Sequence, residues 1–283
     1  MRVARSRELV AQGRPAALVA RVAGISRQAL YRRPARPPAG QRRPLTVTDR
    51  VVLDVARGNP TDGTRMVAAL AGRELGGQVN RKRVQRLMRE HALLQRRRSE
   101  GRRRRPGFFR VERPDQLWHL DMTSVWVAEH GWCYLNAAID CCTREITGWA
   151  LDVRCRAQEA LAVIDAAVAE RGIGPGELTL GSDNGTAFTS RAFRARLAEH
   201  GIVHRRGGYR DPESQAFIES WFSKLKQRCV WREEFETLDE ARHAIGAYVD
   251  RYHHRPHQGL AYRTPREVAA TWKDHDDQSI PAA

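Results

Sequence analysis

The chain has 283 residues, 41% of them hydrophobic, which is enough to bury a core. A net charge of +16 and a pI of about 10.7 indicate a polyanionic partner. The five cysteines form no C-x-x-C pair, and there is neither a membrane-length apolar run nor a secretory signal. This composition argues against a disulfide framework, a zinc knuckle and a membrane protein, and it fits a reduced, cytoplasmic setting.

The charge is unevenly distributed along the chain. Residues 1–113 carry 29 Lys and Arg against 8 Asp and Glu, whereas residues 114–283 carry 20 against 25. A basic front half therefore precedes a mildly acidic back half. This asymmetry predicts a DNA-binding segment attached to a part that uses carboxylates.

The first 36 residues have the pattern of a helix-turn-helix segment. A helix-forming run over 16–23 ends at Gly24, which can adopt a positive φ, and Ser26 can cap a second helix over 27–33. The alternative is a small helical hairpin that does not contact DNA. The candidate DNA contacts in this segment are Arg27 and Arg32.

A proline-rich linker over 37–44 leads to a second, helix-turn-helix-like DNA-binding domain over 45–95. Its expected helices are 48–57, capped by Thr48, then 64–75, and 81–93, capped by Asn80. In the last of these, Val84, Leu87 and Met88 form the buried stripe, and basic residues cover the remaining surface. The candidate DNA contacts here are Arg81, Lys82, Arg83 and Arg86.

An arginine-rich linker over 96–113 follows this domain. Like charges repel one another unless an anion neutralises them, so we expect the run over 96–105 to follow the DNA backbone. Its arginines are Arg96, Arg97, Arg98, Arg102, Arg103, Arg104 and Arg105.

Beyond residue 113 the hydrophobic pattern becomes that of an α/β domain. The expected strands are 117–127, 133–139, 145–151, 178–182 and 202–204. The expected helices are 157–171, 191–200, 212–230, begun by Asp211 and Pro212, and 238–253. This order predicts a ribonuclease-H-like catalytic core over 114–272, a mixed five-stranded sheet with flanking helices, and a tail over 273–283. Four tryptophans are expected in the core: Trp118, Trp149, Trp221 and Trp231.

Asp121 lies inside the first expected strand. Alternation of side chains places it with His119, on the face opposite Leu120 and Met122. Asp is depleted in strand interiors, so a carboxylate there needs a partner, and a metal ion is a suitable one. The alternative is an exposed aspartate on an edge strand.

Two further carboxylates are candidates by position. Asp183 follows the strand over 178–182, where ligands of α/β sheets gather, although Asp-Asn-Gly taken alone is a turn signal. Glu219 borders the apolar stripe of the helix over 212–230, with Lys226 seven residues on and nearly on the same face. The alternative for Glu219 is an ordinary surface glutamate.

Phosphodiester cleavage and strand transfer explain why three carboxylates would be needed. Two Mg²⁺ ions, roughly 3.5–4 Å apart, can activate the attacking oxygen and stabilise the leaving oxygen. Mg²⁺ takes oxygen ligands and keeps several waters, so a few carboxylates suffice, and Mn²⁺ is a plausible substitute. Asp121 and Asp183 would hold both ions, and Glu219 would complete one site.

The residues around these carboxylates form three motifs. They are WHLDMT (118–123) with Tyr134, Asp140 and REITGW (144–149); SDNG (182–185) with FTS (188–190); and AFIESWF (216–222) with Lys226. In this order, and with 35 residues between Asp183 and Glu219, they resemble the D,D-35-E core of retroviral-type integrases. The resemblance implies a DDE-type polynucleotidyl transferase with Asp121, Asp183 and Glu219 as its catalytic and metal-binding residues.

Residues 79–88 (VNRKRVQRLM) and 252–268 (YHHRPHQGLAYRTPREV) carry a narrower resemblance. They are similar to the second-frame (orfB) product of insertion-sequence-3 family transposases, over roughly 45–272. This implies that the partners are double-stranded DNA of the element ends and the target, a homo-oligomer in a synaptic complex, and an upstream-frame protein or fusion with a leucine zipper. No zipper-like heptad run is visible in this sequence.

The chain departs from that family at two places. Ser214 and Gln215 stand where the family often has Asp-Asn, which affects a secondary polar contact. Asp62 and Thr64 stand where it often has an aromatic on each side of Gly63, which is expected either to weaken the packing of the helical domain or to mark a drifted copy.

Three functions are consistent with these sequence features. The first is a transposase that cuts element ends and joins them to target DNA. A catalytically inactive DNA-binding regulator is disfavoured by the intact carboxylate set, and a ribonuclease-H-like nuclease by the basic front half and the tail motif. The histidines His253, His254 and His257 lack an accompanying cysteine pair, so we interpret them as structural or DNA-contacting rather than zinc ligands.

Overall fold

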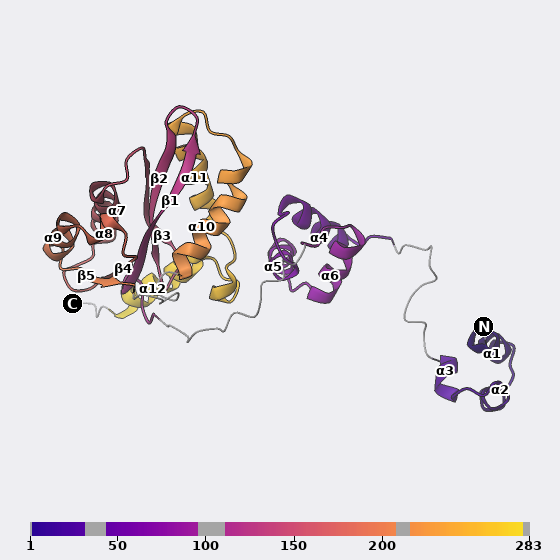
Figure 1. Ribbon diagram of the computed structural model, residues 1–283. Helices are drawn as coiled ribbons and strands as arrows, with labels where there is room; N and C mark the ends of the chain where they lie inside the picture. The colour runs from indigo at the N-terminus through magenta and orange to yellow at the C-terminus, as the bar shows by residue number, and fades with distance from the viewer. Residues whose placement is uncertain (1, 32–43, 96–110, 208–215, 280–283) are drawn as a thin grey trace. The chain divides into compact units, whose positions relative to one another are not determined.

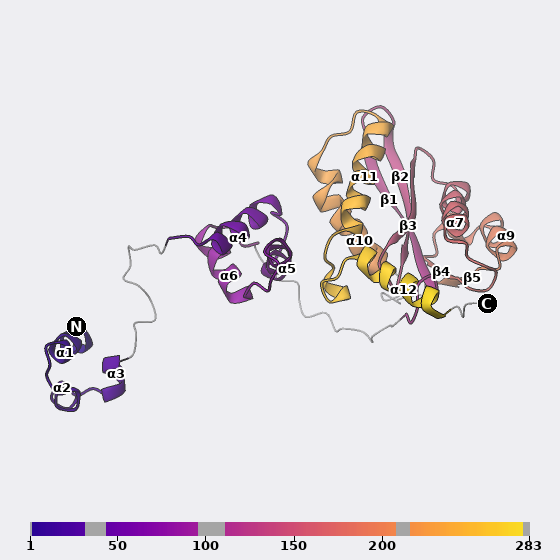
Figure 2. The same cartoon turned by 180° about the vertical axis from the view of Figure 1, so that it is seen from behind.

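The chain forms two compact units, residues 1–46 and 47–283. The computed structural model describes residues 2–31, 44–95, 111–207 and 216–279 (Figures 1 and 2). No helix within these ranges is both long and apolar enough to cross a lipid bilayer.

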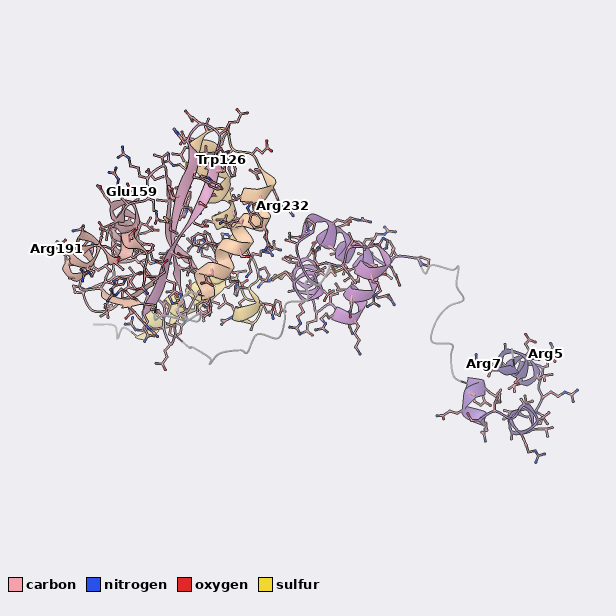
Figure 3. The ribbon with its side chains drawn as sticks, viewed as in Figure 1. Arg5, Arg7, Trp126, Glu159, Arg191 and Arg232 are labelled. Carbon is pink, nitrogen blue, oxygen red and sulfur yellow. The ribbon has the colours of Figure 1, made fainter. Side chains whose placement is uncertain are left out.

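The first unit contains α1 (Arg2–Ala11), α2 (Ala16–Ala23) and α3 (Arg27–Tyr31). Gly24 ends α2 with a φ of 64°, and the Ser26 hydroxyl accepts a hydrogen bond from the Ala29 N–H at 3.2 Å, as the sequence predicted. The sequence did not predict α1. Its Arg7 side chain is labelled in Figure 3. The Arg7 guanidinium donates to the carbonyls of Ala29 and Leu30, both at 3.0 Å, which is a polar attachment that hydrophobic periodicity does not reveal. Arg32 lies outside the described residues.

The second unit begins with α4 (Val47–Gly58), α5 (Thr64–Glu74) and α6 (Arg81–Glu90). Their apolar faces share one core, in which Val52 and Leu87 are fully buried. The side chain of Asn80 caps α6 by accepting from the Lys82 N–H at 2.8 Å, which confirms that prediction. The predicted cap at Thr48 is wrong, since α4 already begins at Val47.

A mixed five-stranded sheet of order β3-β2-β1-β4-β5 follows. Its strands are β1 (Leu117–Val127), β2 (Gly131–Asp140), β3 (Ile146–Asp152), β4 (Thr179–Ser182) and β5 (Val203–Arg206). The first three strands form an antiparallel meander, whereas β4 runs parallel to β1 and β5 parallel to β4. The predicted mixed sheet is confirmed.

Helices cover both faces of this sheet (Figures 1 and 2). One face carries α7 (Ala157–Arg171), α8 (Thr186–Thr189) and α9 (Arg191–Glu199), and the other carries α10 (Ala216–Arg228) and α11 (Leu238–His253). The alternation of β1 divides its side chains between the two cores. Trp118 and Leu120 pack with α7 and α9, and Val125 and Val127 pack with α10 and α11. Asp121, an odd-numbered residue of β1, therefore lies on the α10 side.

Several elements were not predicted. They are α8, the single-turn helices η1 (Val230–Arg232) and η2 (Gln258–Leu260), and α12 (Pro265–Ser279), which runs past the predicted tail boundary at 273. The prediction that all four tryptophans are core residues is wrong for one of them. Trp118 and Trp221 are fully buried, but Trp231 is 69% exposed because it lies in η1, beyond the end of α10.

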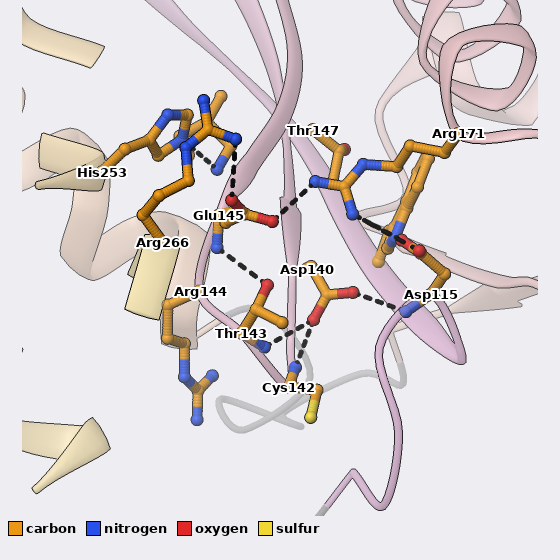
Figure 4. Close-up of polar contacts among 12 residues, drawn as sticks. Asp115, Asp140, Cys142, Thr143, Arg144, Glu145, Thr147, Arg171, His253 and Arg266 are labelled. Atoms are coloured by element: carbon orange, nitrogen blue, oxygen red, sulfur yellow. Dashed lines mark hydrogen bonds and ion pairs between the residues drawn. The ribbon is translucent and has the colours of Figure 1, made fainter. Parts of the chain in front are cut away.

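A buried polar network fixes the turn between β2 and β3 (Figure 4). The carboxylate of Asp140, which is inaccessible to solvent, accepts three backbone N–H bonds at 2.6–2.7 Å, from Asp115, Cys142 and Thr143. Beside it, the Arg171 guanidinium bridges Asp115 at 3.0 Å and the buried Glu145 at 2.9 Å. These contacts fasten the start of β1 to the turn, so the strand that carries Asp121 has a rigid base.

Candidate active site

Asp121 lies in the middle of β1, directly opposite Ala137 of β2. The methyl side chain of Ala137 leaves space beside the carboxylate. One oxygen, Oδ1, accepts from the N–H of Met122 at 2.7 Å. On the same face, two positions earlier, the His119 ring stacks on Phe217 of α10 at 5.9 Å between centroids. This stack holds the first turn of α10 against β1, next to Asp121.

Asp183 directly follows the last residue of β4. β4 pairs in parallel with β1, and Gly181 lies opposite His119. Asp183 and Asp121 each come two residues after this pair, so the parallel register carries both toward the same end of the sheet. The Asp183 Oδ1 accepts from the Gly185 N–H at 2.8 Å, and a Cβ on Gly185 would come within 2.9 Å of that oxygen. Asp183 thus forms the Asp-Asn-Gly turn with one oxygen and leaves the other available.

Glu219 lies in the first turn of α10 and is exposed. Its neighbours Ile218 and Trp221 are buried against β1 and β2, as the apolar stripe predicted. The predicted start of this helix at Asp211 and Pro212 lies outside the described residues.

The electrostatics of Asp121 show that these groups act on one another. Burial raises the pKa of Asp121 to about 6, the Met122 N–H lowers it, the negative charges of Asp183 and Glu219 raise it further, and Lys226 lowers it. The structure therefore brings all four predicted residues within electrostatic reach. Across the described ranges, however, no three His, Cys, Asp or Glu side chains stand close enough to form a ready-made metal site.

The chemistry of the donors fits a divalent cation. All three groups are carboxylates, the hard oxygen ligands that Mg²⁺ prefers. Burial, and then repulsion among the carboxylates, makes ionisation of Asp121 costly in the metal-free protein, and a cation would offset that cost.

The predicted DNA contacts differ in their solvent exposure and in whether they already have an ion-pair partner. Arg27, Arg81, Lys82 and Arg86 are exposed. Arg83 instead donates to the buried carboxylate of Asp49 at 2.7 Å, so a phosphate would compete with that ion pair. The arginines of 96–105 lie outside the described residues.

Two features of the site escaped the sequence reading. The Arg144 guanidinium lies 3.1 Å from the centroid of Phe217, on the ring that also stacks with His119. Behind Asp183, the Ser182 hydroxyl and the His204 ring nitrogen are 2.8 Å apart. Arg144 and Ser182 each occur in one of the integrase-type motifs, and that was the only sequence signal for these contacts. Their partners, Phe217 and His204, lie in distant parts of the chain.

The three histidines of the tail motif have local partners. His253 accepts from the Ile146 N–H at 2.9 Å, and His257 accepts from the Gly259 N–H at 3.1 Å. The His254 ring lies 3.0 Å from the Asp250 carbonyl. These contacts agree with structural roles.

The chain is similar to known proteins over most of its length. Two models described as Integrase core domain match residues 111–212 and 200–265, and one described as HTH-like domain matches 49–103. The chain is 30% identical to the Insertion element IS476 uncharacterized 39.2 kDa protein of Xanthomonas euvesicatoria, over 89% of this chain and 72% of that protein. It is 29% identical to Transposase InsD for insertion element IS2A/D/F/H/I/K of Escherichia coli, over 93% of each.

A solved structure agrees at the level of the fold. A chain of the simian T-cell lymphotropic virus intasome, solved in complex with PP2A regulatory subunit B56 gamma, has a TM-score of 0.50 and 17% identity. The match covers 76% of this chain and 73% of that one. At this identity it supports the ribonuclease-H-like architecture and nothing finer. The sequence matches show that the chain belongs to the insertion-element DNA transposases with an integrase core domain, which are DDE-type polynucleotidyl transferases, as its resemblance to insertion-sequence-3 transposases implied.

Proposed function

We propose that Asp121, Asp183 and Glu219 together hold the divalent metal with which this transposase cuts element ends and joins them to target DNA. The observation that carries the proposal is the packing around Asp121: β4, which ends just before Asp183, pairs in parallel with β1, and α10, which carries Glu219, packs on the same face of β1 through the His119–Phe217 stack. When bound, two Mg²⁺ ions, or Mn²⁺ in their place, would activate the attacking oxygen and stabilise the leaving oxygen.

The residues of the chain would divide the remaining work. Asp121 in its strand and Asp183 at its strand end would provide rigid ligands, and Glu219 would complete the set from α10, which packs on the Asp121 face of β1. Lys226, two helical turns along α10 from Glu219, would bind a phosphate beside the site. Water would attack first and release a 3′-OH, which would then attack a phosphodiester of the target, so no covalent bond between protein and DNA is needed.

The test is an assay with the full chain, Mg²⁺ and a duplex that carries the element's own terminal sequence. We expect a cleaved 3′ end and, with target DNA added, a joined product. Binding without either product would favour the alternative function, a catalytically inactive regulator of transposition. The decisive variant is Asp121→Asn.

The partners are also part of the proposal. The exposed basic residues of α6 and the arginines of 96–105 would bind double-stranded DNA of the terminal repeats and the target. A synaptic complex of two ends would require a homo-oligomer, joined or preceded by an upstream-frame partner. The place of action would then be the nucleoid.

Replacing the seven arginines of 96–105 by Gln should flatten the salt dependence of DNA binding. Each lost phosphate contact lowers the slope of log affinity against log salt by about 0.9. The slope is measured by fluorescence anisotropy over a salt series. The control replaces Arg191 and Arg194, exposed on α9, and should keep the slope. An unchanged slope in the first variant would remove this segment from the interface.

A further inference from the structure

Asp62, in the turn between α4 and α5, is a buried carboxylate at a place where the family resemblance implied an aromatic side chain. Asp62 is only 2% exposed. Its two oxygens accept from two different arginines: Oδ1 from Arg228 Nη2 at 2.7 Å, and Oδ2 from Arg255 Nη2. The departure from the family pattern at Asp62 therefore has a structural explanation, because an ion-pair network occupies the position.

Both arginines belong to the integrase core. Arg228 is the last residue of α10, the helix that carries Glu219, and Arg255 follows the end of α11. Each makes a second contact with the same turn: Arg228 Nε donates to Thr61 Oγ1 at 3.2 Å, and Arg255 Nη1 donates to Asn59 Oδ1 at 3.0 Å. The α4–α5 turn thus binds the ends of two core helices through four hydrogen bonds.

The contact depends on the charge of Asp62. The side chains of Arg228 and Arg255 are only 22% and 24% exposed, so water can replace few of their bonds. Burial lowers the pKa of Arg255, the charge of Asp62 raises it, and the charge of Arg228 lowers it. Without Asp62, two largely buried guanidinium groups would face each other with no anion between them. We therefore expect Arg228 and Arg255 to separate from the α4–α5 turn when the negative charge of Asp62 is removed.

We propose that Asp62 is a positioning residue for catalysis: by holding the C-terminal end of α10 through Arg228, it fixes the placement of Glu219 relative to Asp121. Glu219 and Arg228 are nine residues apart on one helix, about 14 Å along its axis, so a tilt at one end moves the other. This inference rests on the proposed metal-binding role of Glu219. It also makes the helical region of α4–α6 part of the catalytic machinery as well as a DNA-binding element.

The experiment compares Asp62→Asn with wild type in the full chain. The matched control is Asp54→Asn, since Asp54 is an exposed carboxylate of α4 that pairs with Arg57, three residues along the same helix, at 3.5 Å. Hydrogen exchange of α10 and the α4–α5 turn should rise by about tenfold in Asp62→Asn and stay unchanged in the control. The Mg²⁺ concentration for half-maximal cleavage should rise several-fold, while affinity for end DNA changes by less than about twofold.

A second variant keeps the test informative if Asp62→Asn does not fold. Arg228→Lys retains the positive charge but loses the fork that reaches Asp62 and Thr61 together, so it should show the same two changes to a smaller degree. Wild-type exchange of α10 and an unchanged Mg²⁺ requirement in both variants would overturn the proposal. The exchange measurement needs no activity. If wild type itself fails to cleave, the proposed function fails, while the exchange result still decides whether Asp62 holds α10.

Discussion

Asp121→Asn is expected to abolish Mg²⁺-dependent cleavage of the element end and to leave DNA binding intact. The amide keeps the size of the side chain but removes the negative charge that a divalent ion requires. The basic residues proposed to bind DNA are on other elements, so affinity should not change. Cleavage is measured on a labelled end duplex and binding by anisotropy in the same buffer. The control is Asp250→Asn, because Asp250 is an exposed carboxylate of α11.

The same variant should raise the stability of the metal-free protein, an effect that an ordinary loss of function would not produce. Burial and the neighbouring carboxylates raise the pKa of Asp121 from 3.8 to about 6, so ionisation opposes folding. For an acid whose pKa is raised by folding, this penalty is fully present above pH 6 and disappears as the pH falls towards 4. We expect Asp121→Asn to be more stable by about 2 kcal/mol at pH 8 and equal to wild type near pH 4.

Urea unfolding in EDTA at the two pH values measures this difference. Added Mg²⁺ should then stabilise wild type by mass action and leave Asp121→Asn unaffected. Full cleavage activity in the variant would eliminate the metal-binding role of Asp121. Equal stability at pH 8 would show instead that burial and the neighbouring carboxylates do not penalise ionised Asp121 in the folded protein.

Local pattern was sufficient for much of the fold. The bounds of β1, α7 and α11 agree with the expected 117–127, 157–171 and 238–253, because each segment has one strong periodicity and clear ends. α1 and η1 were missed for a different reason. Arg7 attaches α1 through backbone carbonyls 22 and 23 residues away, and η1 is a single turn of three residues.

The candidate site depended on more than local pattern. Asp183 forms the turn that its sequence signals, and its nearness to Asp121 follows only from the parallel pairing of β1 and β4. The partners of Asp62 lie 166 and 193 residues away, so nothing near it in the sequence predicts its burial. Pairings of this kind are set by the tertiary fold, which composition and spacing do not encode directly.

Asp140 shows why a buried aspartate in a strand is not by itself a metal ligand. Like Asp121 it belongs to the integrase-type motif, and it ends the strand next to β1. Its two oxygens, however, already accept three backbone N–H bonds, which leaves little capacity for an ion. The sequence alone could not separate the two roles, because both residues follow the same strand pattern.

Asp140→Ala should therefore destabilise the protein by about 3 kcal/mol, because it leaves three buried N–H groups without an acceptor. Burial raises the pKa of Asp140 although its three donors lower it, so loss of the charge alone costs little and loss of the acceptor oxygens dominates. Asp140→Asn should then be milder, since the amide oxygen can still accept from Cys142 and Thr143.

Thermal unfolding distinguishes these cases, with a Tm lower by about 10 °C expected for Asp140→Ala. Asp152→Ala is the control, because its carboxylate accepts an N–H bond from Arg154 at 3.1 Å, at an exposed position rather than inside a buried network. If Asp140→Ala kept its stability and lost Mg²⁺-dependent cleavage, Asp140 would be a ligand rather than a support. The assignment of Asp121 to the metal and Asp140 to the turn requires opposite effects on metal-free stability, a gain at Asp121 and a loss at Asp140, because one carboxylate lacks partners that the other already has.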